Sequence, residues 1–337
     1  MNCIIFGGTG FIGRHFALYL IHHANFEKVI LADIKALQAH EINSELQHAI
    51  NSKQIEYVYC DVRNPIDIKQ QLNIDLIANF AAIHREPGHD DWEYFDTNVK
   101  GATNVCEFAD KCQCAKIIFT SSISPYGPTE ESKDEQSALT PETADGKSKV
   151  EAEQIHQVWQ ASDSPNKNLV TVRPGVVFGS GEGGNVTRLI KAIKGRYFFY
   201  TGNKETIKAG VYIKELCYAM NWVMQQQLQS NETFSLFNMT MQPSPSMNEY
   251  VKTICEVAGF KRFIPSCPYG LLYATAYMVE CLASLLKIKQ PISPIRVRKL
   301  VRSNNIVPKY LASKGYQYQY TLKSAFEDWK KDNPSDW

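Results

Sequence analysis

Three glycines near the N-terminus have a spacing that serves phosphate binding. Gly7, Gly10 and Gly13 form the pattern G-x-x-G-x-x-G, after an apolar run at 2–6 and before a helical pattern at 14–24. Free N–H groups and the helix dipole favour an anion at the start of a helix. Glycines permit the tight turn and the close approach of a pyrophosphate. Because the strand and the helix that this motif requires both flank it, the sequence predicts a dinucleotide site.

Acidic residues end the next two predicted strands and bear on the choice of nucleotide. Asp33 lies about twenty residues past the glycine motif, where a carboxylate can accept hydrogen bonds from both ribose hydroxyls of adenosine. The same charge would repel a 2′-phosphate, so we expect NAD, although Lys35 keeps this preference from being decisive. The alternative role for Asp33 is to cap a helix that begins near Ala36. Asp61 follows the third strand and is placed to bond the adenine amino group.

Further candidates follow the fourth and fifth predicted strands. The run 74–80 leads into Ala81 and Ala82, whose small side chains would let a dinucleotide lie across the strand ends. His84 comes next, on a loop that we expect to face the ligand, where it either contacts substrate or is simply solvated. The fifth strand, 116–120, ends in a serine-rich segment.

The elements that must position these residues alternate between strands and helices. Helical patterns at 94–112 and 146–160 separate strand patterns at 74–80, 116–120 and 169–172. Such alternation predicts an α/β fold with a Rossmann-type, doubly wound parallel sheet and right-handed crossovers. Ligands of these sheets bind beyond the C-terminal ends of the strands, which is where the candidate residues lie.

The pattern changes after Pro174, where 175–184 contains five glycines and is expected to be a loop. A short helix is expected at 185–194, and Ser246 is expected to cap a helix at 247–258. We divide the chain into an NAD-binding domain and a smaller C-terminal substrate-binding lobe. The first comprises 1–175 with 210–240 returning to it, and the second comprises 176–209 and 241–337.

Composition excludes several classes of partner. The chain has 337 residues, 44% of them hydrophobic, with 36 Lys and Arg against 35 Asp and Glu. This overall balance gives no strong field that points to nucleic acid or to an acidic membrane. We expect no signal peptide, because neither a basic nor an apolar leader pattern is visible before the first strand, and nine scattered cysteines fit a reduced, cytoplasmic protein.

One apolar stretch bears on membranes. Residues 269–286 are largely apolar, but Glu280 interrupts them and their length is marginal for a span. We therefore expect no transmembrane span and interpret the stretch as a buried or dimer-interface helix. An interfacial membrane helix is the alternative.

These motifs together resemble the extended short-chain dehydrogenase/reductase family, in its nucleotide-sugar epimerase/dehydratase branch. The resemblance covers nearly the whole chain and rests on the order and spacing of motifs at 7–13, 33, 61–62, 79–82, 97–104, 120–122, 126–127, 146–149, 173–174 and 211–216. It implies tightly held NAD, a UDP-linked sugar substrate and a homodimer. The cofactor residues that it implies are Gly7, Gly10, Phe11, Ile12, Gly13, Asp33, Asp61, Val62, Ala81, Ala82, Asn98, Lys149 and Pro174.

The resemblance also implies a mechanism: hydride leaves a sugar carbon, usually C4, while a tyrosine takes the hydroxyl proton. A phenol titrates near pH 10, so the family places a lysine four residues later on the same helix face to stabilise the phenolate. Lys149 matches that lysine, and Ser122 matches the serine that bonds the reacting oxygen. The tyrosine is replaced, because Tyr-Gly-Lys-Ser-Lys appears here as Asp145-Gly-Lys-Ser-Lys149.

Three interpretations of Asp145 follow. It acts as a shorter and weaker base, another residue replaces it, or the protein turns over slowly while keeping its ligands. Tyr126 and His84 are the candidate replacements. Losing a positioned general base costs about 10²–10⁴ in rate.

Substrate residues implied by the resemblance lie near the second lobe and the loops after the strands. Arg302 is the preferred second phosphate ligand, with Arg296 and Arg298 as rivals, and Lys208 replaces an arginine that is common in the family. The substrate candidates are His84, Ser124, Tyr126, Asn185, Lys208 and Arg302; a solvated surface residue is the alternative for each cation. The sequence contains no pattern that predicts a metal site.

Overall fold

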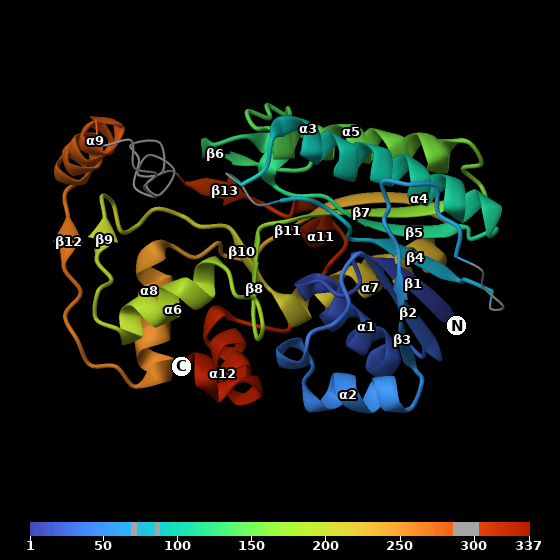
Figure 1. The fold of residues 1–337 in the computed structure, drawn as a ribbon, viewed down its shortest axis with the longest axis horizontal. Coiled ribbons are helices and arrows are strands. Elements are labelled where there is room, and N and C mark those ends of the chain that lie inside the picture. Colours follow the sequence, from blue (N-terminus) through green and yellow to red (C-terminus); the bar gives the residue numbers. More distant parts are fainter. Residues whose placement is uncertain (69–72, 85–87, 286–302) are drawn as a thin grey trace.

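The computed structural model describes residues 1–68, 73–84, 88–285 and 303–337. Within them, seven parallel strands form one sheet in the order β11-β7-β5-β4-β1-β2-β3 (Figure 1). This confirms the Rossmann-type α/β fold predicted from the alternation of elements. The strands are β1 (Asn2–Phe6), β2 (Lys28–Asp33), β3 (Ile55–Tyr59), β4 (Leu76–Asn79), β5 (Lys116–Thr120), β7 (Asn168–Pro174) and β11 (Phe234–Met239).

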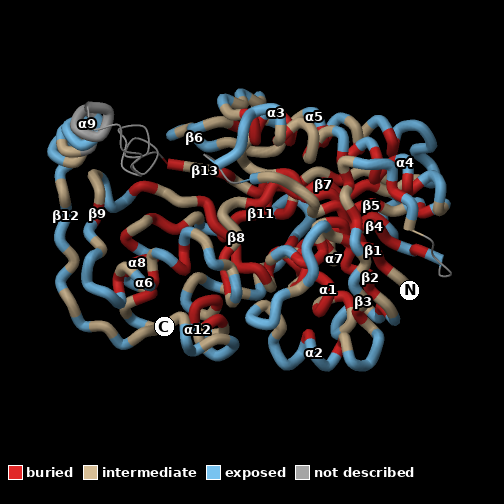
Figure 2. The backbone as a smooth tube through the Cα atoms, in the orientation of Figure 1, coloured by how far each residue is buried: buried red, intermediate tan, exposed pale blue. Residues whose placement is uncertain are grey.

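Helices cover both faces of this sheet. One face carries α1 (Phe11–His23), α2 (Ser44–Asn51) and α7 (Ile213–Ser230), and the other carries α3 (Asp91–Tyr94), α4 (Lys100–Lys111) and α5 (Ala144–Ala161) (Figure 1). Successive strand residues point to opposite faces. Ile4 and Phe6 therefore pack in the core beneath α4 and α5, whereas Cys3 and Ile5 pack beneath α1 and α7. Burial of both faces explains why the strands are apolar runs rather than alternating ones (Figure 2).

The remaining chain forms smaller sheets and helices. Parallel pairs join β8 (Val176–Phe178) to β10 (Gly210–Tyr212), β9 (Tyr200–Thr201) to β12 (Ser266–Cys267) and β6 (Thr129–Lys133) to β13 (Asn304–Ile306). The other helices are α6 (Asn185–Lys194), α8 (Met247–Ala258), α9 (Tyr269–Leu285), α11 (Lys309–Ser313) and α12 (Leu322–Asp332). Across the described ranges, no helix combines the length and the apolar character needed to cross a bilayer.

Two local expectations were wrong. The glycine-rich stretch expected as a loop contains β8, because its Val-Val-Phe triplet pairs with β10, more than thirty residues further along the chain. No helix begins at Ala36: a short 3-10 helix, η1 (Ala39–Glu41), comes first, and α2 starts at Ser44, where the side chain of Asn43 accepts the N–H of Leu46 at 2.8 Å. Asp33 therefore caps no helix, and the ribose role remains the interpretation of its carboxylate.

Candidate functional site

The glycine turn after β1 is packed against the end of β4. Gly7 has a φ of +73°, and a Cβ added there would lie 2.6 Å from the backbone nitrogen of Ala81. A Cβ at Gly13 would lie 2.5 Å from the carbonyl oxygen of Gly8. Gly10 precedes the first turn of α1, and no described side chain caps that turn. The turn is thus as close to the strand ends as backbone allows, and its helix N-terminus suits a pyrophosphate.

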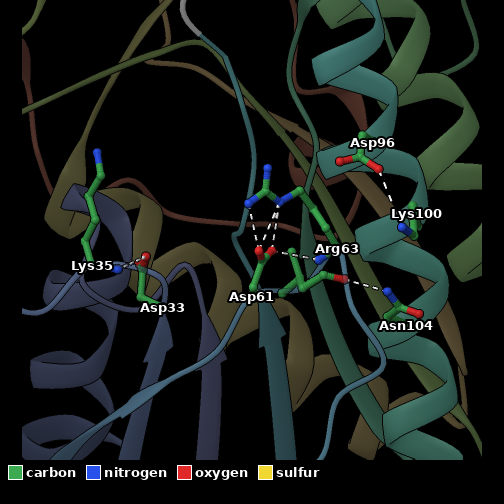
Figure 3. Close-up of polar contacts among 8 residues, drawn as sticks. Asp33, Lys35, Asp61, Arg63, Asp96, Lys100 and Asn104 are labelled. Atoms are coloured by element: carbon green, nitrogen blue, oxygen red, sulfur yellow. Dashed lines mark hydrogen bonds and ion pairs between the residues drawn. The ribbon is translucent and has the colours of Figure 1, made fainter.

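Asp33 stands beside this turn at the end of β2. Its carboxylate accepts the backbone N–H groups of Thr9 and Lys35, both at 3.2 Å. The ammonium of Lys35 extends away from that carboxylate (Figure 3). Two backbone donors therefore hold the Asp33 carboxylate next to the glycine turn, while its remaining lone pairs stay available to ribose hydroxyls.

Asp61 has a partner that sequence reasoning missed. The guanidinium of Arg63 binds its carboxylate in a fork, with Nη2 2.7 Å from Oδ2 and Nε 2.9 Å from Oδ1 (Figure 3). These hydrogen bonds hold the pKa of Asp61 below its usual range. Next to it, the carbonyl of Val62 accepts the side-chain amide of Asn104 at 2.7 Å. In the sequence, the cation two residues after Asp61 was the signal that could have predicted this pair. The adenine role of Asp61 stays a prediction.

Asn98 fixes the segment that follows β4. Its Oδ1 accepts the N–H of Ile83 at 2.9 Å, and its Nδ2 donates to the carbonyl of Ile83 and to the Oγ of Ser148. The short helical segment η2 (Phe95–Val99) carries this buried side chain. Ala81 and Ala82 lie directly before Ile83, so Asn98 ties the strand-end segment to α5. The cofactor-binding role of Asn98 stays a prediction.

The helix α5 carries Asp145 and Lys149 one turn apart, on the same face. Lys149 is 4% exposed, and its ammonium donates to the carbonyl of Thr120 at 3.0 Å. Burial lowers the pKa of Lys149, opposed by the carboxylates of Asp145 and Glu153.

Asp145 is 8% exposed, and its Oδ1 is buried with no hydrogen-bond partner among the described residues. A buried carboxylate oxygen needs a partner. A water molecule or a ligand hydroxyl would supply one. Asp145 Oδ1 is therefore a suitable hydrogen-bond acceptor for a bound ligand.

Two serines after β5 complete the edge. The Oγ of Ser122 accepts the N–H of Ser124 at 3.0 Å, which leaves its proton free to donate. The Oγ of Ser124 is buried and finds no partner in the part of the chain that the structure describes. Pro174, the last residue of β7, accepts the N–H of Ile123 at 3.2 Å and so holds this loop in place.

A buried polar network lies behind the serines. Arg173 forms a fork with Glu153 at 2.8 and 2.6 Å, and Ser121 donates to the same carboxylate. Arg173 also donates to the hydroxyl of Tyr126, which in turn donates to Asn238, each at 2.8 Å. Tyr126 is 0% exposed and burial raises its pKa. With its hydroxyl engaged inside the core, Tyr126 is badly placed to contact a substrate or to replace the missing base.

The other substrate candidates lie in different parts of the chain and make different contacts. His84 is exposed at the crevice side of the chain, next to residues outside the described ranges. Asn185 begins α6 and accepts a guanidinium hydrogen bond from Arg188 at 2.6 Å. Burial lowers the pKa of Lys208 to about 8, opposed by the carboxylate of Glu130. Arg302 and its rivals at 296 and 298 lie outside the described residues. The substrate-binding roles of these residues stay predictions.

Comparison with known proteins identifies the family. The model of the NAD dependent epimerase/dehydratase family matches residues 3–236. The chain belongs to this family.

A 4-epimerase of Escherichia coli O157:H7 that acts on N-acetyl-alpha-D-glucosaminyl-diphospho-ditrans,octacis-undecaprenol is 26% identical over 97% of this chain and 93% of its own length. A 3beta-hydroxysteroid-dehydrogenase/decarboxylase of Arabidopsis thaliana is also 26% identical, over 88% of this chain and 71% of its own length.

The structure of the Helicobacter pylori ADP-L-glycero-D-manno-heptose-6-epimerase shares the fold. Its TM-score is 0.74 at 20% identity, over 99% of this chain and 96% of that one. NAD is thus the cofactor of this family, and the uncapped α1, the crowded Gly7 and the Asp33 carboxylate fit it. When bound, NAD supplies a hydride acceptor and donor at its nicotinamide ring.

Proposed function

We propose that this NAD-dependent family member inverts C4 of a sugar that is linked to its carrier through a diphosphate, and that Asp145 makes this reaction slow. The observation that carries the proposal is the buried carboxylate of Asp145, which lies on the same helix face as Lys149. The ammonium of Lys149 binds the end of β5, and Ser122 follows that strand directly. The cofactor residues, Ser122 and Lys149 keep the family pattern, so ligand binding is expected to survive while proton transfer suffers.

Each residue has a distinct task in this proposal. Ser122 donates a hydrogen bond to the C4 oxygen and thereby orients the hydroxyl. Lys149 supplies a positive charge that stabilises negative charge on that oxygen as its proton leaves. Asp145 accepts the proton, but a carboxylate is a much weaker base than a phenolate, and its side chain is several ångströms shorter than that of tyrosine. A bridging water between Asp145 Oδ1 and the sugar would close that gap.

The carrier is either UDP or a polyprenol. The family pattern favours UDP, as expected from the sequence. A polyprenyl carrier is favoured by the exposed apolar helix α9 and by the E. coli relative, whose name gives such a substrate and which matches nearly the whole chain. Both carriers present a sugar α-linked to a diphosphate, so the chemistry at C4 is the same.

The test is a substrate panel with purified wild type and Asp145→Tyr. UDP-glucose, UDP-N-acetylglucosamine and N-acetylglucosaminyl-diphospho-polyprenol in detergent are each incubated with both proteins, and 4-epimers are separated by chromatography. We expect turnover of one carrier class, faster by about 10²–10⁴ with Asp145→Tyr. Absence of any interconversion by either protein would sink the proposal.

Two other functions give different results in the same experiment. A keto-sugar reductase or a sterol-type dehydrogenase, the activity that the Arabidopsis relative's name carries, would consume or produce free NADH in proportion to product. A binding protein without catalysis would retain NAD in calorimetry while Asp145→Tyr stays inactive. An epimerase recycles its cofactor in place, so no net NADH appears. The expected homodimer is checked separately by sedimentation of the same samples.

A further inference from the structure

The end of the molecule farthest from β3 exposes an unusual number of apolar side chains. Among the described residues, eight of the fifteen exposed large hydrophobic residues lie within 197–199, 263 and 269–279: Tyr197, Phe199, Phe263, Tyr269, Leu271, Tyr277, Met278 and Val279. They belong to α9 and to the two segments that precede β9 and β12. Figure 2 shows α9 as largely exposed at this end.

The described part of α9 has an apolar stripe on its exposed surface. Leu271, Ala274 and Met278 recur at helical spacing and are all exposed, with Leu271 60% and Met278 56% accessible. Glu280 is the only charged residue between 269 and 285, and helical periodicity places it on the opposite side from Leu271. Within the described chain, no helix or strand makes more than marginal contact with α9.

The neighbouring segments add positive charge and aromatic rings. The pairing of β9 with β12 brings 195–204 beside 261–268, directly before α9. Exposed cations here are Lys191, Arg196, Lys204 and Lys261, and none forms an ion pair with a described acidic residue. Between the segments lies an open hollow of about 370 Å³ lined by Arg196, Tyr197, Phe199, Lys261 and Phe263.

We propose that this end, comprising α9 and the segments 195–204 and 261–268, docks on the surface of a membrane that contains anionic phospholipids. Interfacial helices carry apolar side chains into the headgroup boundary while nearby basic residues bind anionic lipids. Tyrosines are enriched at that depth, and Tyr269, Tyr273 and Tyr277 recur every four residues. The described part of α9 has 17 residues and is about 25 Å long, which is shorter than a hydrocarbon core of about 30 Å.

Charge favours a membrane over a second copy of the chain. A two-fold interface places the same patch on both partners. It would therefore set two clusters of unpaired Lys and Arg near one another, whereas an anionic bilayer neutralises them. The inference is independent of the proposed function, since membrane binding is measured without any sugar substrate.

The experiment is co-sedimentation of the full chain with vesicles of phosphatidylcholine alone or mixed with phosphatidylglycerol. Leu271→Glu/Met278→Glu disrupts the apolar stripe, and Arg196→Glu/Lys261→Glu reverses two charges. Leu228→Glu is the matched control, because Leu228 is 53% exposed on α7 outside this surface.

Wild type is expected to bind the anionic vesicles at least tenfold more strongly than the neutral ones, and less so in high salt. The apolar variant should lose at least tenfold in binding. Arg196→Glu/Lys261→Glu removes two cations, and each lost cation should weaken vesicle binding about fivefold. Leu228→Glu should bind as wild type does. Unchanged unfolding midpoints show that the variants fold.

Three results would overturn the proposal: no vesicle binding by wild type, equal binding by the apolar variant, or equal loss in the control. A wild-type dimer that Leu271→Glu/Met278→Glu converts to monomer without any vesicle binding would also overturn it, and would assign the face to a second copy.

Discussion

At the scale of single residues, Gly7 is where backbone shape most directly decides cofactor binding. Its φ is positive, and an added Cβ would lie only 2.6 Å from the backbone nitrogen of Ala81, so there is no room for a side chain. Gly7→Ala is therefore expected to weaken NAD binding about 10- to 100-fold, since relieving strain of about 1–3 kcal/mol requires the turn to move. Calorimetric titration with NAD measures the change.

Gly259 provides a matched control for that substitution. It has a φ of +74°, but a Cβ there would meet nothing within 4 Å, and it ends α8 far along the chain. Gly259→Ala should lower the free energy of unfolding by about 1–2 kcal/mol and leave NAD affinity unchanged. Equal NAD affinities for wild type and Gly7→Ala would contradict the role given to the glycine turn.

Single residues also show where the sequence was insufficient. Spacing placed Lys149, Ser122 and Asp145 at one edge, because the helix repeat and the parallel strand ends are local and regular. It could not show that Tyr126 is buried, because the partners that engage its hydroxyl, Arg173 and Asn238, come from two other strands. The sequence shows a cation two residues after Asp61, but it could not show the fork between Arg63 and Asp61, because that geometry depends on side-chain rotamers.

At the scale of elements, the pair Glu153–Arg173 fastens α5 to β7 behind the site. Both side chains are at most 5% exposed and lie 2.6 Å apart. Removing one partner leaves the other charge buried, so Glu153→Gln is expected to destabilise the fold by about 3–5 kcal/mol. Urea unfolding measures this change.

An exposed pair gives the comparison. Lys323 and Glu256 lie 2.5 Å apart with side chains 52% and 60% exposed. Lys323→Met should leave the urea midpoint close to that of wild type, because solvent screens such pairs. If Glu153→Gln were as mild as Lys323→Met, the buried network could not be what positions α5.

Elements also differ in how well local sequence determines them. The bounds of α6 and α8 match their predictions, because a periodic apolar face and, for α8, the Ser246 cap lie within the segment itself. The strand β8 was missed because its stability comes from β10, which the sequence places more than thirty residues away. The expected domain division still awaits a test, although β11 does pair with β7 in the main sheet.

At the scale of the whole molecule, His156 links folding to pH. It is 0% exposed and stacks on Phe119, its Nδ1 donates to the carbonyl of Ala152, and its Nε2 accepts the side-chain amide of Asn79. Burial lowers the pKa of His156 to about 4. In the unfolded chain the pKa of His156 is near 6.5, so this residue binds more protons in the unfolded state than in the folded state between pH 6.5 and about 4. Stability must therefore fall as the pH falls through that window.

Between about pH 7.5 and about pH 5, His156 is expected to account for roughly 2 kcal/mol of lost stability. His156→Gln should remove that part of the loss, while His48→Asn on the exposed side of α2 should not. Burial also lowers the pKa of His15, which contributes equally in each protein. Parallel urea titrations of the three proteins at both pH values give the difference, and identical slopes for all three would refute the assignment.

The central claim, that the site retains its ligands and lacks an adequate base, is tested most directly by single-turnover hydride transfer. Wild type, Asp145→Asn and Asp145→Tyr are loaded with NAD and mixed with the substrate identified in the panel, and the absorbance of reduced nicotinamide is followed. Asp145→Tyr should reduce bound NAD about 10²–10⁴ times faster than wild type, and Asp145→Asn should be slower than wild type. NAD reduction that is equally fast in all three proteins would contradict the claim.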